Sequence, residues 1–384
     1  MQTPISISGI ASISPLGIST EEVWRRYLSG TPSFKIKEFS GEPKPIASLG
    51  EEAEQQLSQL RTSNSSYKNL DKSVLMAMIA SRKAMNPGDF EGKQIGINIG
   101  SSRGATELFE KYHTQFQKTR KVSPYTSPTT TLGNISSWVG QDLGIDGVHI
   151  GHSVTCSTAL HAVLNGIAWL KADMADVFLV GGSEAAITPF TIAQMEALKL
   201  YSHAKGEFPC ESMLFDKKRN TMVLGEGAAV AVLEKGISER TQAVILGYGF
   251  ASEPLEHNSS ISKNADCFQR SMQRALDSAG LETVDAVIMH APGTVKGDCA
   301  EFNAIQEVFR NKLPALTTNK YLVGHTFGAS GMMSMEMAVL MLQHNKLIFN
   351  PFYGSHGGDI QHLKTVMVNA VGFGGNAVSI LVTK

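Results

Sequence analysis

The chain has 384 residues, and its 34 lysines and arginines nearly balance its 35 aspartates and glutamates, which gives a formal net charge of −1. A chain of this length suits about two or three compact units, and its 42% of hydrophobic residues excludes a disordered protein. The balanced charge argues against a nucleic-acid-binding protein that is held by phosphate contacts.

Short apolar runs alternate with helical patterns along the whole chain. Strands are expected at residues 5–13, 94–100, 177–182, 228–233, 243–249, 284–290, 365–370 and 378–382. Helices are expected at residues 21–28, 71–84, 157–172, 265–279, 298–309 and 331–343. This alternation indicates an α/β protein with mostly parallel sheets.

The two halves of the chain echo each other weakly. Residues 5–12 and 244–252 each read as a strand that runs into glycine and then into Ala-Ser. A duplicated α/β unit, with its halves meeting near residue 240, explains this echo. Chance explains it as well, because strands that end in small residues are common. Two polar stretches, 32–70 and 201–220, are expected to be surface insertions.

The four cysteines, Cys156, Cys210, Cys267 and Cys299, have no CxxC spacing and no histidine pair at zinc-finger spacing. Their scatter predicts neither a disulfide framework nor a metal site, and a reducing cytoplasm is the expected location. The N-terminus lacks a secretory pattern, and no apolar run reaches about 18 residues, so no membrane span is expected. The motifs of P-loop, dinucleotide-binding, serine-hydrolase elbow and zincin proteins do not occur.

Cys156 has the sharpest local signal for chemistry. A strand-like run at 149–154 leads into it, and small residues and a helical pattern follow. The positive end of a helix dipole favours the reactive thiolate, which indicates a nucleophile. Free cysteines are more often buried and structural, and the local pattern alone favours neither interpretation. His325, which lies among small residues before a helix, is the candidate partner for proton transfer, and His290 ends a predicted strand.

A series of ordered blocks resembles the β-ketoacyl-acyl-carrier-protein synthases of the elongating type, in the thiolase-like superfamily. The blocks lie at 8–17, 155–157, 180–185, 214–219, 224–228, 292–301, 320–325 and 372–375. They span nearly the whole chain, so the resemblance is much more specific than any single motif.

The resemblance implies an architecture. It is a duplicated fold with two mixed sheets, stacked as five layers in the order α/β/α/β/α. Residues 1–240 would form the N-terminal half, with the nucleophile and the surface insertions. Residues 241–384 would form the C-terminal half, with His325 and a glycine-rich loop. A homodimer, or a heterodimer with a related ketosynthase, is the expected assembly.

The resemblance also implies a reaction. Cys156 would take an acyl group from the phosphopantetheine arm of an acyl carrier protein. Malonyl carrier protein would then lose carbon dioxide and condense with that acyl group, in the synthesis of a fatty acid, a polyketide or a polyene. The phosphopantetheine arm is a substrate carrier, and no tightly bound cofactor, metal, nucleic acid or membrane partner is implied.

By the same resemblance, individual residues receive roles. The catalytic residues would be Cys156, His325, Lys320 and Glu301. The substrate-binding residues would be Phe373, Thr294, Pro292 and Gly374. Backbone N–H groups of Cys156 and Phe373 would hold the oxyanion of both acyl transfers.

Pro292 is a departure from the family pattern, because elongating synthases have the first of two histidines there. Proline has no side-chain donor for the malonyl thioester carbonyl, and losing one such donor costs about 10²–10³ in rate. In the last loop, Asn376-Ala377 follow the glycines where the family usually has Thr-Asn.

Three interpretations of this departure stay open. The favoured one is a condensing enzyme in which His325 does the donor work and water, Thr294 or His290 fills the gap. The second is a partner subunit like the chain-length factors, which usually lose the cysteine itself. The third is an acyltransferase or thioesterase that does not decarboxylate.

Overall fold

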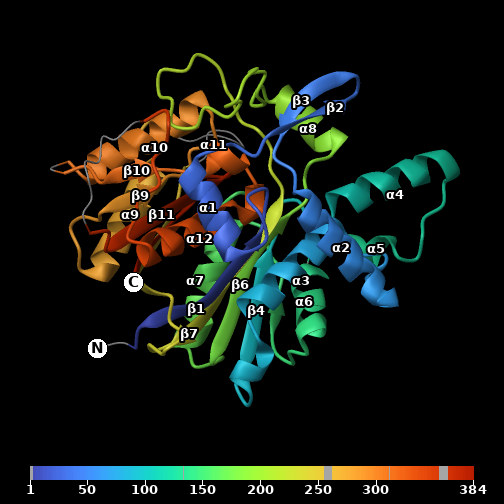
Figure 1. Cartoon of the computed structure of the whole chain (residues 1–384), viewed down its shortest axis with the longest axis horizontal. Coiled ribbons are helices and arrows are strands. Elements are labelled where there is room, and N and C mark those ends of the chain that lie inside the picture. Colours follow the sequence, from blue (N-terminus) through green and yellow to red (C-terminus); the bar gives the residue numbers. More distant parts are fainter. Residues whose placement is uncertain (1–2, 133, 255–261, 311, 354–361) are drawn as a thin grey trace.

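The strands of the computed structural model form two groups that share one order, and Figure 1 shows the two halves of the molecule that contain them. The structure describes residues 3–132, 134–254, 262–310, 312–353 and 362–384. The N-terminal group has the order β1-β7-β6-β4-β5, with β1 (Ile5–Ile13), β4 (Ile95–Gly100), β5 (His149–Ile150), β6 (Val177–Glu184) and β7 (Gly227–Lys235). The C-terminal group has the order β8-β12-β11-β9-β10, with β8 (Ala243–Ser252), β9 (Ala286–Ile288), β10 (Ala315–Thr317), β11 (Thr365–Gly372) and β12 (Asn376–Thr383).

The strand directions repeat as well. In the N-terminal group, β7 is antiparallel to both of its neighbours, β1 and β6, and the other neighbouring strands are parallel. In the C-terminal group, β12 is likewise antiparallel to β8 and β11, and the other neighbouring strands are parallel. This repeat confirms the expected duplication. The strands β1 and β8, which carry the sequence echo, take equivalent places in the two groups.

The two expected sheets are joined along their inner edges. Residues 5–7 of β1 pair antiparallel with residues 243–245 of β8, so the described strands of both groups form one ten-stranded sheet. This pairing satisfies the N–H and C=O groups that two free inner edges would expose. The predicted division at 240/241 falls in the turn between β7 and β8, and we propose it as the boundary between the repeats.

Helices cover both faces of each half of the sheet. The described helices are α1 (Thr20–Ser29), α2 (Glu51–Ser63), α3 (Lys72–Ala84), α4 (Thr106–Thr119), α5 (Thr126–Thr130), α6 (Asn134–Leu143), α7 (Thr158–Lys171), α8 (Pro189–Ala197), α9 (Asp266–Ala279), α10 (Val295–Val308), α11 (Lys320–Val323) and α12 (Ser330–Gln343). Helices α3 and α6 pack outside the N-terminal strands, α9 and α10 pack outside the C-terminal strands, and α7 and α12 lie between the two halves. The expected five layers are therefore confirmed. None of the described helices is both long enough and apolar enough to cross a bilayer.

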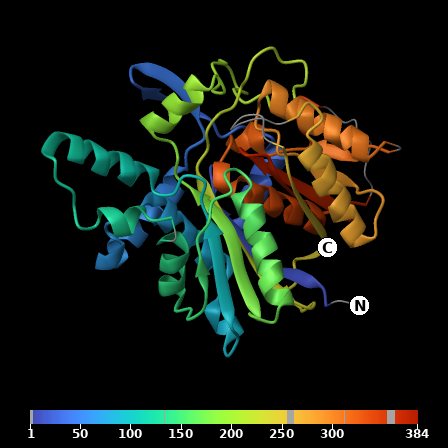
Figure 2. The same cartoon turned by 180° about the vertical axis from the view of Figure 1, so that it is seen from behind.

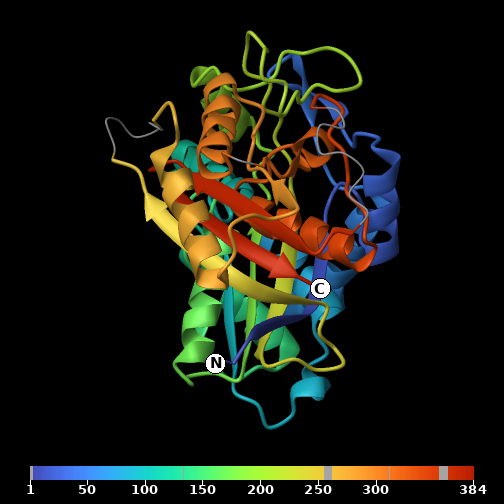
Figure 3. The same ribbon diagram turned by 90° about the vertical axis from the view of Figure 1, so that its left-hand side faces the viewer.

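The alternation of side chains along the strands builds these layers. In β6, Phe178 and Val180 belong to the central core with α7 and α12, whereas Val177 and Leu179 belong to the core beneath α3. Helix α12 is buried on all sides, as its almost uniformly apolar, methionine-rich sequence predicts. Seen from the side in Figure 3, β11 and β12 (red) run obliquely to the cyan and green strands of the other half.

The two predicted insertions differ from the expectation. Segment 32–70 holds a hairpin, β2 (Lys35–Phe39) with β3 (Glu42–Ile46), followed by α2. Segment 201–220, all of it described, has no helix or strand, but the expectation of a surface insertion is wrong for much of it. Its residues Ser202, Cys210 and Lys217 are buried. The lysine can be buried because an aspartate from the other half pairs with it.

Helix α4 was not predicted, and it projects from the body in Figures 1 and 2 (teal). Thr106 is its buried residue, while Phe109 and Phe116 are exposed. The helix therefore packs little of its surface on the described core, so its apolar residues gave no clear core-facing pattern.

Candidate active site

Cys156 lies in the tight connection between β5 and α7, beside the N-cap Ser157. The residue before it, Thr155, has a left-handed backbone with φ of 49°, which is unusual for a β-branched side chain and marks a strained turn. The turn places the thiol in an apolar cluster with residues such as Phe39, Leu224 and Phe327, and Cys156 is only 6% exposed.

Two backbone N–H groups lie near enough to the sulfur of Cys156 to favour its charged form. They are its own N–H and the N–H of Phe373, which lies in the glycine-rich loop between β11 and β12. Thr155 Oγ1 donates to the Phe373 carbonyl at 3.2 Å, which fixes that loop against the cysteine turn. These are the same two N–H groups that the sequence named as oxyanion donors, and that role stays a prediction.

The protonation state of Cys156 differs from the expectation. Burial, with the charge of Glu184 adding to it, raises the pKa of the thiol to about 12, against the opposing effects of Lys320 and the two N–H groups. The thiol is therefore protonated at neutral pH in the resting site, and the expected thiolate is wrong for this state. A base must take the proton when the acyl group arrives.

Backbone contacts fix His325 in the wall of the cavity that the Cys156 thiol also lines. Its N–H donates to the Val223 carbonyl at 2.7 Å, and the preceding Gly324 has φ of 64°. A side chain on Gly324 would meet that same carbonyl oxygen at 2.6 Å, so only glycine fits there. Burial, with Lys320 adding to it, lowers the pKa of His325 to about 3. The imidazole is therefore neutral, with one ring N–H to donate.

Lys320 and Glu301 occupy different places. Lys320 is 1% exposed, does not line the cavity, and donates from Nζ to Asn319 Oδ1 at 2.9 Å. Burial lowers the pKa of its ammonium group to about 8. Glu301 lines the cavity and accepts the backbone N–H groups of His290 and Ala291, each at 2.9 Å. Burial raises the pKa of Glu301 to about 7.

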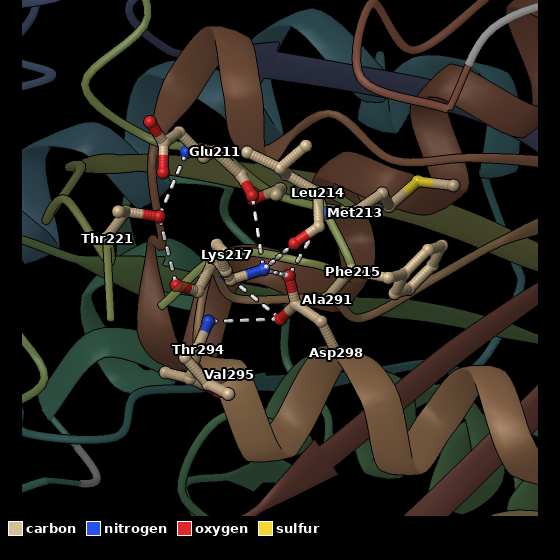
Figure 4. Close-up of polar contacts among 12 residues, drawn as sticks. Glu211, Met213, Leu214, Phe215, Lys217, Thr221, Ala291, Thr294, Val295 and Asp298 are labelled. Carbon is tan, nitrogen blue, oxygen red and sulfur yellow. Dashed lines mark hydrogen bonds and ion pairs between the residues drawn. The ribbon is translucent and has the colours of Figure 1, made fainter. Parts of the chain in front are cut away.

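A buried ion pair of Lys217 with Asp298 lies beside the turn that contains Thr294 (Figure 4). Lys217 Nζ contacts Asp298 Oδ2 at 2.7 Å, with side chains 1% and 0% exposed. The other carboxylate oxygen accepts the N–H groups of Gly293 and Thr294 at 3.1 and 3.0 Å. Asp298 thereby fixes the turn that enters α10. Both residues lie in blocks that resemble the family, although no role was predicted for either.

One cavity of about 700 Å³ brings most of the predicted residues together. Its lining includes Cys156, Glu301, His325, Pro292, Thr294 and Phe373, together with His290. Of the predicted residues, Lys320 lies behind the wall, and Gly374 is outside the lining although Gly372 and Gly375 belong to it. The exposed cations Lys218, Arg219 and Lys296 also line the cavity. They were missed, because isolated lysines and arginines in polar stretches give no signal of a shared site.

The part of the chain that the structure describes contains no cluster of three or more His, Cys, Asp or Glu side chains that could hold a metal ion.

Comparison with family models decides the family. Residues 2–237 match the N-terminal domain of beta-ketoacyl synthases, and residues 242–351 match the C-terminal domain. The chain belongs to the β-ketoacyl synthase family. The family consists of condensing enzymes of the acyltransferase type, so the expected class is confirmed.

Individual members of the family are similar over nearly their whole length. The 3-oxoacyl-[acyl-carrier-protein] synthase 2 of Coxiella burnetii is 28% identical, with 99% of this chain and 98% of the relative covered. The enzyme of the same name from Vibrio cholerae is 27% identical, with 98% of each covered. Among solved structures, the ishigamide ketosynthase/chain length factor superposes with a TM-score of 0.85 at 20% identity, covering 100% of both chains. This likeness confirms the ketosynthase fold.

Gly372 offers a first test of the oxyanion geometry in this β-ketoacyl synthase. A Cβ at this position would lie 1.7 Å from Thr155 Oγ1 and 2.6 Å from the Val154 carbonyl oxygen. The threonine can rotate, but the backbone oxygen cannot, so Gly372→Ala must displace the N–H of Phe373. Because a displacement of about 1 Å can cost about a hundredfold in rate, we expect that loss in acyl transfer to Cys156.

The measurement is the rate of thioester formation, followed by intact mass. Gly50→Ala is the matched control, since no atom lies within 4 Å of its Cβ position and its φ is −76°. Equal acylation rates for the two variants would show that the Phe373 N–H does not act on the acyl group.

Proposed function

We propose that this chain is a working condensing enzyme. In the first half-reaction, Cys156 Sγ attacks the acyl carbonyl of a carrier thioester, the C–S bond of that thioester breaks, and the proton of Cys156 passes to the leaving thiol. In the second, the bond between the malonyl α-carbon and its carboxylate breaks, carbon dioxide leaves, and the electron pair forms an enolate. The enolate carbon attacks the acyl group, the C–S bond breaks, and the Cys156 thiolate takes up a proton.

The observation that supports this proposal best is the pair of N–H groups at the Cys156 sulfur, inside a cavity that His325 also lines. A carbonyl carbon bonded to that sulfur would place its oxygen near the same donors, which stabilise the charge that develops there. The apolar cluster around Cys156 suits an acyl chain rather than a polar substrate.

The carrier of the acyl group would be a phosphopantetheine arm on an acyl carrier protein. Such an arm contains a phosphodiester, and the exposed cations Lys218, Arg219 and Lys296 line the cavity through which the thioester must enter. Charge attraction at an exposed rim mainly accelerates association and depends on salt.

These cations give a second prediction. The double variant Arg219→Glu with Lys296→Glu is expected to raise the KM for an acyl carrier protein about tenfold, the equivalent of about 1.4 kcal/mol. The KM for the same acyl group on pantetheine, which has no phosphate, should stay within about threefold. Lys83→Glu, an exposed position on the outer helix α3, is the control. An equal rise for both substrates would contradict a phosphate-binding rim.

We propose that Pro292 stands where the family has its first histidine. Pro292 lines the cavity but has no side-chain hydrogen-bond donor. This favours a second candidate function, an acyltransferase that accepts acyl groups on Cys156 but does not decarboxylate malonyl groups. A partner subunit is less well supported, because Cys156 is present together with both backbone donors.

One assay separates these candidates. The protein is incubated with acyl and malonyl carrier proteins, and carbon dioxide and β-ketoacyl product are measured. A condensing enzyme yields both in equal amounts. Acylation of Cys156 without carbon dioxide supports the acyltransferase. Product that forms only after a second ketosynthase is added supports the partner subunit.

The assembly and the location are part of the proposal. The exposed side chains Phe109 and Val122, 63% and 59% exposed, suit a contact with a second copy or with a related ketosynthase. The four free thiols suit a reducing cytoplasm. Sedimentation of the purified protein tests the dimer.

A further inference from the structure

A second imidazole packs against that of His325 in the wall of the active-site cavity. The ring of His290 meets that of His325 edge to face, with ring centres 5.1 Å apart and an interplanar angle of 88°. Both side chains line the cavity with Cys156, and they are 5% and 2% exposed. Neither Nδ1 atom has a hydrogen-bond partner among the described residues. Two imidazole rings whose Nδ1 atoms have no described partner thus lie in one cavity, where the proposed reaction needs hydrogen-bond donors.

The chain is held in the conformation that brings His290 there. Strand β9 ends at Ile288, and the next turn passes through Ala291, whose φ of 25° is strained for a residue with a side chain. The two oxygens of Glu301 accept the N–H groups of His290 and Ala291, each at 2.9 Å. Asn369 Nδ2 donates to Glu301 at 3.2 Å and helps to fix the carboxylate. A strained turn that is clamped in this way is typical of a functional position.

The electrostatic setting keeps both rings neutral. Burial, with the nearness of His325 and Lys320 adding to it, lowers the pKa of His290 well below its ordinary value. A neutral imidazole has one N–H to donate. His290 therefore has the form needed to donate a hydrogen bond to a carbonyl oxygen that becomes an enolate.

We propose that His290 is a catalytic residue that donates this hydrogen bond to the malonyl thioester oxygen during decarboxylation. The inference rests on the proposed condensing function. Pro292, two residues further on, lines the same wall and has no donor. His290 acts in the second half-reaction only: the bond to the carboxylate breaks, its electron pair moves to the enolate, and the N–H of His290 stabilises the enolate oxygen. Acyl transfer to Cys156 uses the backbone donors and does not need His290.

The test separates the two half-reactions in His290→Phe, which keeps an aromatic ring against His325 but has no donor. Acylation of Cys156, followed by intact mass, should stay within about threefold of the unmodified protein. Release of carbon dioxide from saturating malonyl carrier protein should fall about 10²–10³-fold. His290→Gln, with an amide N–H in place of the imidazole N–H, should recover at least about tenfold of that loss. His344→Phe is the control, since His344 stacks on Trp24 outside the cavity.

Several outcomes overturn the inference. One is a His290→Phe variant that releases carbon dioxide at the unmodified rate. Another is a His290→Phe variant in which the rate of Cys156 acylation falls as much as the release of carbon dioxide, because His290 would then affect both half-reactions. If His290→Phe shows no cooperative unfolding, the same comparison is made with His290→Ala. If the unmodified protein acylates but releases no carbon dioxide, the proposed condensing function itself fails, and that result is distinct from any effect of His290.

Discussion

Replacing Cys156 by alanine is expected to abolish the transfer of acyl groups from a carrier protein. Alanine has no sulfur, so no thioester can form, and product formation should fall about 10⁴-fold or more, as it does when a covalent nucleophile is removed. The fold should survive, because the change leaves the apolar cluster of Phe39, Leu224 and Phe327 in place and costs about 1 kcal/mol. The measurement combines intact mass with product analysis.

Cys267→Ala is the matched control for this variant. Cys267 is as deeply buried as Cys156 but lies on the outer helix α9 and does not line the cavity. The Cys267→Ala protein should be acylated on Cys156 at the rate of the unmodified protein. An acyl adduct on the Cys156→Ala protein, or its loss in Cys267→Ala, would mean that the nucleophile is elsewhere.

Breaking the buried pair of Lys217 and Asp298 is expected to cause the largest loss of stability. Asp298→Ala leaves the lysine charge in a site that is 1% exposed and removes the acceptor of three backbone N–H groups. Uncompensated buried charges of this kind cost about 3–5 kcal/mol, which should appear in the free energy of unfolding in denaturant. Glu307→Ala is the control, because Arg310 and Glu307 also approach to 2.7 Å but at the surface. That exposed pair should contribute at most about 1 kcal/mol.

The reverse change, Lys217→Met, adds a dependence on pH. Burial raises the pKa of Asp298, and Lys217 opposes this shift, so removing the lysine raises the pKa of the folded carboxyl further. A carboxyl whose pKa is higher in the folded state loses stability as the pH rises above its unfolded value. The variant should therefore be least destabilised, relative to the unmodified protein, at acid pH. An equal loss in the free energy of unfolding at low and at high pH would contradict a charged Asp298.

The apolar patterns of the sequence predicted several helices well, while the five layers were implied by the family resemblance. The expected helix at 331–343 is α12 (Ser330–Gln343), where an unbroken apolar sequence can only be buried, and 71–84 is α3 (Lys72–Ala84). The joining of the two halves could not be predicted, because the pairing of β1 with β8 involves only a short edge. Helix α4 escaped prediction because little of it packs on the described core.

The site was predictable only through the family resemblance. Cys156, His325 and Phe373 are far apart in the chain, and no local pattern shows that β5, α11 and β11 end at one cavity. The protonated thiol was not foreseen, because burial exceeds the helix-end effect that the sequence suggests. The contact between the rings of His290 and His325 was equally hidden, since the two residues are far apart in the chain.

The most direct test of the account is a single-turnover experiment at Cys156. The protein is first acylated by an acyl carrier protein, separated from it, and then mixed with malonyl carrier protein, while intact mass and carbon dioxide are followed. We expect the adduct on Cys156 to disappear at the same rate as carbon dioxide and β-ketoacyl product appear, one for one. An adduct that persists, or that leaves as free acid without carbon dioxide, would contradict decarboxylative condensation at this site.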